Sequence, residues 1–127
     1  MKLQLDRIDH IHVFVADRTA AQRWYAEVLG LIPVAALAHW AKDGGPLTLA
    51  NADGAIHLAL FERPPKASRS TVAFGVNQQV WQAWRQHLDQ LALSYTAEDH
   101  GQTVSIYFDD PDGNPYEITC PAPLSRA

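Results

Sequence analysis

The sequence is poor in cysteine, in clustered positive charge and in long apolar runs. Its single cysteine, Cys120, cannot form a disulfide within the chain, so nothing demands an oxidising compartment. The net charge is −4 and no Lys/Arg-rich run occurs, which argues against nucleic acid or an anionic membrane as the main partner. No apolar run approaches the roughly 18 residues that a membrane span needs. The first ten residues, MKLQLDRIDH, are too polar for a signal peptide, and we expect a cytoplasmic protein.

What the sequence does contain is enough apolar material for one compact domain over residues 1–127. Hydrophobic residues make up 47% of the chain and charged residues 19%, which is ordinary for a globular protein. Alternation predicts a strand over 7–16, and Asp17 then suits the cap of a helix that runs to about Leu29 and ends at Gly30. Further strands are expected at 31–40, 46–51 and 55–61, separated by Asp-Gly turns.

The same order of elements follows a linker at 62–69, which holds two prolines and no periodicity. A strand is predicted at 71–76 and a helix at 78–91, with strands near 92–96, 102–109 and 115–120. The pattern is βαβββ, twice: module one covers about 7–61 and module two about 70–120. This predicts an α+β fold in which the two modules form an open, curved mixed sheet.

The repeat pairs particular residues of the two modules. Placing 10–15 over 71–76 puts His10 opposite Thr71. Placing the Asp-Gly turn of 53–61 over that of 112–120, with one extra residue in the second copy, brings His57 opposite Glu117. The neighbours of these four residues are apolar and are expected to pack beneath the helices. The four side chains then share the opposite face, where they can converge if the modules join.

Two histidines and one carboxylate on converging strands predict a transition-metal site at His10, His57 and Glu117. Imidazole nitrogen and carboxylate oxygen suit Fe, Mn, Co, Ni or Zn as the divalent ion, and the sequence does not choose between them. The alternative is that both histidines lie on a solvated sheet face while Glu117 pairs with an arginine. His12, two residues from His10 on the same face, is either an acid/base in the pocket or a strand histidine with a hydrogen-bond partner.

Two segments, DHIHVFVADRTAAQRWYAEVLGL near the start and SIYFDDPDGNPYEI near the end, resemble the vicinal oxygen chelate superfamily. This superfamily contains glyoxalase I, fosfomycin-resistance enzymes, extradiol ring-cleaving dioxygenases and bleomycin-binding resistance proteins. The resemblance covers about residues 7–120. It implies paired βαβββ modules and a metal that chelates two adjacent substrate oxygens, with His10 and Glu117 as ligands. His57 falls where glyoxalase-like members carry a Glu or Gln ligand, whereas Thr71 stands where most metal-dependent members carry a histidine.

The segment DHGQTVSIYFDDPDGNPYE (99–117) is also similar to the signature of ring-cleaving dioxygenases. In that family the tyrosine that matches Tyr107 hydrogen-bonds an oxygen of the bound substrate, and the histidine that matches His100 lies nearby, outside the ligand sphere. Glu98 departs from the small or apolar residue usual at its position. The structural alternative is that Tyr107 is a strand aromatic and His100 an exposed turn residue. Ring-cleaving members are also usually about twice this length.

The sequence therefore predicts a metal-dependent enzyme that acts on a small oxygen-rich organic molecule, and it predicts a homodimer. Glyoxalase-like lyase or isomerase chemistry and dioxygenase chemistry both remain open, with Tyr107, His100 and His12 as the candidate catalytic residues. The alternative is a metal-free protein of the same fold that binds an antibiotic or metabolite. Thr71 favours this alternative and the two predicted histidine ligands oppose it.

Overall fold

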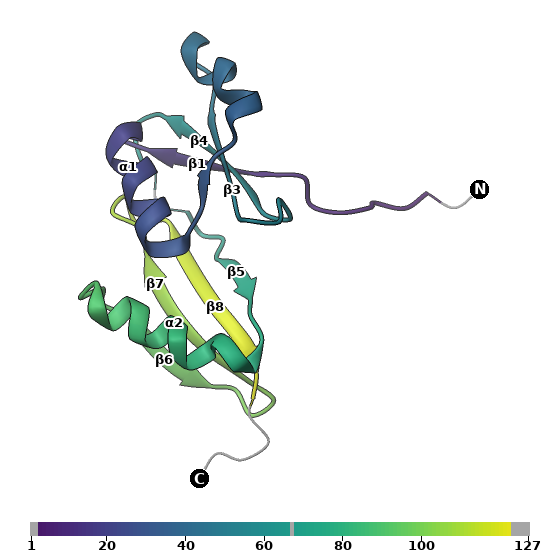
Figure 1. The fold of residues 1–127 in the computed structure, drawn as a ribbon, viewed down its shortest axis with the longest axis vertical. Coiled ribbons are helices and arrows are strands. Elements are labelled where there is room, and N and C mark those ends of the chain that lie inside the picture. The colour runs from purple at the N-terminus through teal and green to yellow at the C-terminus, as the bar shows by residue number, and fades with distance from the viewer. Residues whose placement is uncertain (1–2, 67, 123–127) are drawn as a thin grey trace. The chain divides into compact units, whose positions relative to one another are not determined.

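The structure is a computed structural model that describes residues 3–66 and 68–122 (Figure 1). The chain divides into two compact units, Met1–Pro65 and Lys66–Ala127. The boundary falls within the linker predicted at 62–69, of which residue 67 lies outside the described residues, as do 1–2 and 123–127 of the predicted domain. Each unit is treated by itself below.

The first unit has the predicted order of one strand, a helical segment and three strands. Its sheet has the order β1-β4-β3-β2, in which β1 runs parallel to β4 and the other neighbours are antiparallel. The elements are β1 (Ile11–Val15), α1 (Arg18–Trp24), the π-helical turn η1 (Tyr25–Leu29), β2 (Ile32–Pro33), the 3-10 helix η2 (Ala35–Asp43), β3 (Leu47–Ala50) and β4 (His57–Glu62).

The second unit repeats this topology. Its sheet has the order β5-β8-β7-β6, again with one parallel pair, β5 and β8. The elements are β5 (Val72–Gly75), α2 (Gln78–Gln90), β6 (Thr96–Asp99), β7 (Thr103–Asp109) and β8 (Pro115–Pro121). The predicted α+β class and the βαβββ duplication are therefore confirmed, as two mixed four-stranded sheets.

The first helical segment begins and ends at the predicted residues Asp17 and Gly30, and the second helix also begins at a capping side chain. The side chain of Asp17 accepts a hydrogen bond from the backbone N–H of Ala20 at 3.0 Å, and that of Asn77 accepts one from Val80 at 3.2 Å. Each bond satisfies a donor that the first turn of a helix leaves unpaired. Gly30 ends the first helical segment with φ of 68°, in the left-handed region that glycine adopts most easily.

The strand faces also follow the predicted alternation. On β1, Val13 and Val15 are buried whereas His12 and Phe14 are exposed. On β8, the buried Tyr116, Ile118 and Cys120 alternate with half-buried residues. In Figure 1, α2 lies against the sheet of its own unit, where it buries Trp81 and Leu88. Burial of such side chains, at about 25 cal/mol per Å² of apolar surface, is the main stabilising contribution in each unit.

Two predicted strands are wrong. Only Ile32 and Pro33 of the segment 31–40 are extended, and a 3-10 helix follows from Ala35. Its run ALAHWA has three alanines and no β-branched residue, a composition that favours helix over strand. The strand predicted near 92–96 instead spans Thr96–Asp99. The chain is still completing the end of α2 at Leu93, whose N–H donates to the carbonyl of Leu88 at 3.0 Å.

The residue pairing predicted for the repeat is also wrong, because the turns before the last strands differ in length. In the first unit Ala50 pairs with His57 across six turn residues, 51–56. In the second unit Asp109 pairs with Pro115 across five, 110–114. The second copy is thus one residue shorter, not one longer. His57 takes the place of Pro115, and the place of Glu117 is taken in the first unit by Ala59.

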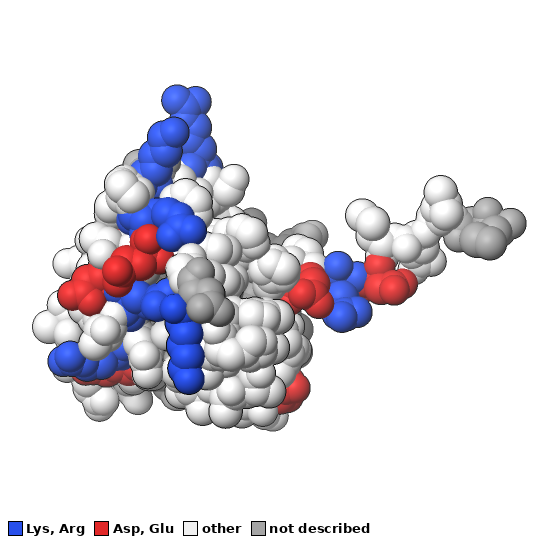
Figure 2. Space-filling model, turned by 90° about the horizontal axis from the view of Figure 1, so that it is seen from above, with Lys and Arg blue, Asp and Glu red and all other residues white. Residues whose placement is uncertain are grey.

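Two surface properties bear on the class of partner. Within the described part of the chain, no helix combines the length and apolar character needed to cross a membrane. Figure 2 shows basic side chains flanked by acidic ones on the face in view. Together with the net charge of −4, this mixed surface offers no preference for a polyanion.

Candidate functional site

The first unit contains a cavity that two predicted metal ligands share. The cavity measures about 220 Å³ and lies on the sheet face opposite the helix-packed core, between β3, β4, η2 and the segment that directly precedes β1. Both His10 and His57 line it, so the structure brings these two histidines together as predicted. The lining residues are Asp9, His10, Leu37, Trp40, Pro46, Thr48, His57 and Ala59.

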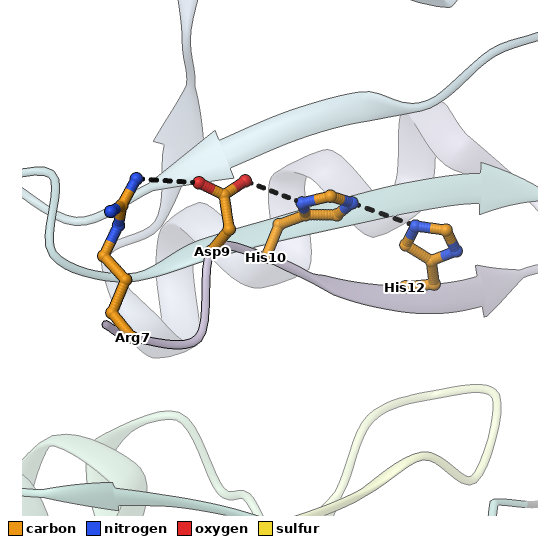
Figure 3. Close-up of polar contacts among 4 residues, drawn as sticks. All are labelled: Arg7, Asp9, His10 and His12. Atoms are coloured by element: carbon orange, nitrogen blue, oxygen red, sulfur yellow. Dashed lines mark hydrogen bonds and ion pairs between the residues drawn. The ribbon is translucent and has the colours of Figure 1, made fainter. Parts of the chain in front are cut away.

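His10 is held by a neighbouring carboxylate (Figure 3). Its Nδ1 lies 2.9 Å from Oδ2 of Asp9, and Nη2 of Arg7 donates to Oδ1 of the same carboxylate at 3.1 Å. The hydrogen bond from His10 lowers the pKa of Asp9 below its usual value, and the charge of Arg7 adds to this effect. Asp9 is therefore an anion at neutral pH and accepts the Nδ1–H proton. This tautomer leaves Nε2 of neutral His10 with its lone pair available.

His12 lies beside His10 on the exposed face of β1. The Nε2 atoms of the two rings are 3.0 Å apart, and the rings stack with centroids 5.0 Å apart and planes inclined at 24°. The other neighbour of His12 is Phe61, whose ring centroid lies 4.7 Å away. Of the two predicted alternatives for His12, the structure contains the hydrogen-bond partner, which is His10 itself.

In the second unit, Glu117 lies half-buried on β8 and has polar partners on β7. Oγ of Ser105, a fully buried residue, donates to Oε2 of Glu117 at 2.7 Å. Tyr107 stands directly opposite Glu117 in the antiparallel ladder. A carboxylate at a half-buried strand position is thus satisfied within its own unit. Coordination of one ion by Glu117 together with His10 and His57, which belong to the other unit, stays a prediction.

Tyr107 connects Glu117 with the predicted His100. Nε2 of His100 lies 2.9 Å from the phenol oxygen of Tyr107, so the pair from the dioxygenase-like signature is brought together. Partial burial raises the pKa of Tyr107 above its ordinary value, and the negative charge of Glu117 raises it further. The phenol therefore stays protonated at neutral pH and is a hydrogen-bond donor rather than a base.

A broader cleft of about 530 Å³ lies beside this cluster in the second unit. Both Thr71 and Tyr107 line it, together with residues of β6, β8 and the segment that follows α2. Thr71 is exposed and directly precedes β5. Its hydroxyl is available to a ligand in the cleft as a hydrogen-bonding group, which is a weaker role than metal coordination.

Sequence reasoning missed two residues that support this chemistry. Asp9 orients His10, and the adjacent Asp-His pair in the sequence was the available signal. Ser105 supports Glu117, and its signal was the period of two that places Ser105 and Tyr107 on one face of β7. Both are positioning residues rather than predicted ligands.

The donor chemistry of the first unit fits a divalent transition metal. A metal-binding histidine usually donates its second ring N–H to a carboxylate or carbonyl, as His10 does to Asp9. Within either unit, and counting only described residues, no three His, Cys, Asp or Glu side chains gather around one point.

Comparisons with known proteins agree with this fold. Three similar solved structures are a glyoxalase/dioxygenase from Nostoc punctiforme, a virulence protein from Salmonella typhimurium and the fosfomycin resistance protein FosX from Listeria monocytogenes complexed with Mn(II) and sulfate. Their identities to this chain are 22%, 28% and 13%, with TM-scores of 0.71, 0.65 and 0.72. The alignments cover 97%, 94% and 94% of this chain and 99%, 100% and 93% of the other.

Among curated proteins, no sequence match was found. Residues 7–118 match the sequence profile of one protein family. The match spans both βαβββ units and includes His10, His57 and Glu117. The chain belongs to the Glyoxalase/Bleomycin resistance protein/Dioxygenase superfamily.

Proposed function

We propose that this protein is a metal-dependent enzyme that acts on a small, oxygen-rich organic molecule. The ion is Fe, Mn, Ni, Co or Zn in the divalent state, held by His10, His57 and Glu117. The observation that carries the proposal is the shared cavity of His10 and His57, in which Asp9 fixes the tautomer of His10. The bound ion supplies a Lewis acid for substrate oxygens or, in the case of iron, a centre that activates dioxygen.

The first unit is suited to bind and orient a small substrate. Its cavity of about 220 Å³ is smaller than the 300–1,000 Å³ of typical ligand pockets, which favours a compact molecule. Leu37, Trp40 and Pro46 form apolar walls that reduce water around the ligand. Thr48, from β3, contributes the hydroxyl that can fix an oxygen of the substrate on the sheet side.

The second unit is suited to donate and transfer a proton. Tyr107 keeps its proton at neutral pH and can donate a hydrogen bond to an oxygen on which negative charge develops. His100, 2.9 Å from the phenol oxygen, can relay a proton to or from it. These roles fit both a ring-cleaving dioxygenase and a lyase or isomerase of the glyoxalase kind, and both remain within the proposal.

A second candidate is a metal-free protein that binds a small molecule such as an antibiotic. The observation in its favour is Thr71, which lines the cleft of about 530 Å³ in place of a residue that could hold a metal. On this candidate the cleft of the second unit is the ligand site, and the histidines of the first unit contribute no metal affinity.

Metal titration separates the two candidates. Calorimetric titrations with Mn(II), Fe(II), Co(II), Ni(II) and Zn(II) compare wild type with His10→Ala, His57→Ala and Glu117→Gln. His87→Ala is the control, because His87 lies on α2 and lines neither cavity. We expect each ligand variant to weaken binding by roughly tenfold or more, about 1.4 kcal/mol, and the control to bind as wild type does. Wild-type affinity equal to that of His57→Ala for every ion would leave only the metal-free candidate.

Reaction class and oligomeric state follow from the same preparations. Oxygen uptake with catechols in the presence of Fe(II) identifies a dioxygenase, whereas activity without oxygen uptake identifies a lyase or isomerase.

We also propose a homodimer. Among the described residues, β1 and β5 each lie at an edge of the sheet of their own unit, and edge strands support association. Sedimentation equilibrium at several concentrations measures the assembly directly, and a constant monomer mass would contradict this part of the proposal.

A further inference from the structure

The imidazole of His12 on β1 and that of His10, which directly precedes β1, approach each other through the same ring atom, Nε2. Nε2 of His10 and Nε2 of His12 are 3.0 Å apart, and both rings project from one face of the first unit (Figure 3). His12 is exposed, and Nδ1 of His10 is already occupied by Asp9. The close approach is therefore made by the one ring nitrogen of His10 that Asp9 does not engage and by Nε2 of His12.

The separation of these atoms matches that of two neighbouring ligands on one ion. Imidazole nitrogen binds a first-row divalent ion at about 2.1 Å, and two such ligands at a right angle lie about 3.0 Å apart. In the metal-free protein one proton must lie between the two nitrogens, because two lone pairs at that distance repel. Since Asp9 takes the Nδ1 proton of His10, the proton between the rings belongs to His12.

Release of Nε2 of His12 requires only a change of tautomer. The proton moves to Nδ1 of the same exposed ring, where water can accept the hydrogen bond. The backbone needs no rearrangement, because the two Nε2 atoms already lie 3.0 Å apart. Phe61, with its ring centroid 4.7 Å from that of His12, supports the ring from the neighbouring strand β4.

The sheet register gives a second, independent indication. His12 pairs with Ala59 across β1 and β4, and the corresponding pair of the second unit is Ala73 with Glu117. The corresponding cross-strand pair of the two sheets thus contains one potential ligand in each unit. In the second unit this ligand is the carboxylate of β8, whereas in the first unit the last strand has only alanine and the first strand has His12.

From these observations we propose that His12 binds the divalent ion directly through Nε2, as a neighbouring ligand to His10. The proposal deepens the metal-dependent function proposed above and rests on it. His12 is then a ligand and not an acid/base of the pocket. The first unit then contributes a pair of neighbouring imidazoles, from His12 on β1 and from His10 directly before this strand.

Nitrogen NMR tests this assignment without altering the chain. Long-range ¹⁵N–¹H spectra of the full-length protein, recorded before and after addition of Zn(II), report each ring nitrogen separately. We expect Nε2 of both His10 and His12 to move to the metal-bound position and the proton of His12 to appear on Nδ1. His39, His87 and His100 serve as internal controls whose rings are not expected to change in this way.

Affinity gives a second readout. His12→Ala is expected to weaken Zn(II) and Ni(II) binding by roughly tenfold or more, and His12→Gln to restore little of it. A His12 ring that keeps its Nε2 proton while His10 binds Zn(II) would overturn the inference and leave the proposed function intact. Absence of Zn(II)-dependent change at His10 as well would overturn both.

Discussion

The turn that precedes Glu117 is held by one buried carboxylate, and its removal should be strongly destabilising. Asp110 is only 4% exposed. Its Oδ1 accepts hydrogen bonds from the backbone N–H groups of Asp112 at 2.9 Å and Asn114 at 2.8 Å, and its Oδ2 accepts one from Nδ2 of Asn114 at 2.8 Å. These bonds close the five-residue turn that places Glu117 opposite Tyr107.

The size of the effect follows from these three bonds. Hydrogen bonds to a charged group contribute about 1.5–3 kcal/mol each, and a buried donor left unpaired adds about 1–3 kcal/mol. The losses are not additive, because the turn can relax and admit water, so we expect about 4 kcal/mol for Asp110→Ala. Asp110→Asn keeps one oxygen for the two backbone donors and turns its own amide toward Asn114, and we expect about 2 kcal/mol for it.

Urea unfolding followed by circular dichroism measures both variants. A shift of the midpoint at constant slope reports a change in stability alone. Asp53 provides the matched control, because it accepts one backbone hydrogen bond, from Ala55 at 2.9 Å, in an exposed turn of the first unit. Asp53→Ala should lose no more than about 1 kcal/mol. If Asp110→Ala and Asp53→Ala unfold at the same urea concentration, the turn does not depend on the buried carboxylate.

Two further predictions concern residues outside the candidate site. Burial raises the pKa of the Cys120 thiol, so the unfolded chain loses this proton first and stability should fall as pH rises through the unfolded pKa. Cys120→Ala should remove that part of the pH dependence, and Ellman's reagent should react slowly with native protein and quickly in urea; equal rates would contradict the burial. Arg18 donates to the backbone carbonyls of Gly45 at 2.8 Å and Ala41 at 3.0 Å, so Arg18→Ala should cost about 1–2 kcal/mol in urea unfolding. The same substitution should also increase the rate of backbone amide hydrogen exchange in residues 40–46. An unchanged exchange rate would show that these hydrogen bonds do not hold the segment.

Local signals in the sequence predicted much of the fold. The helix cap at Asp17, the stop at Gly30 and the alternation of β1 and β8 depend on a few neighbouring residues, and all are present in the structure. The strand predicted after Pro33 was wrong because the alternation of apolar residues in this segment is also compatible with a short helix. Helix or strand was decided there by propensity rather than by the apolar pattern.

The residue pairing between neighbouring strands could not be predicted from such local signals in the sequence. The sequence shows an Asp-Gly pair in both turns, but the number of residues that each turn contains depends on which backbone groups close it. Asn51 closes the first turn with Ile56, and Asp110 closes the second with Asn114. The prediction made the second copy one residue longer, whereas its turn is one residue shorter, so the pairing of the last strand differs from the predicted one by two residues. His57 was therefore matched with the wrong residue of the second unit, although its place in a cavity with His10 was predicted.

The two βαβββ units share one backbone topology but carry different polar side chains at corresponding positions of their sheets. Rungs that correspond in the two sheets hold Thr48 and Tyr107 on the third strand, and Ala59 and Glu117 on the last. The first unit therefore has no acid at the position that corresponds to Glu117. Its imidazoles belong to His12 on β1, to His10 directly before β1 and to His57 at the start of β4. The second unit has the carboxylate and the phenol there instead. Metal-assisted chemistry needs nitrogen donors that hold an ion and a donor to an oxyanion. In the function we propose, the imidazoles of the first unit meet the first need and the phenol of the second unit meets the second.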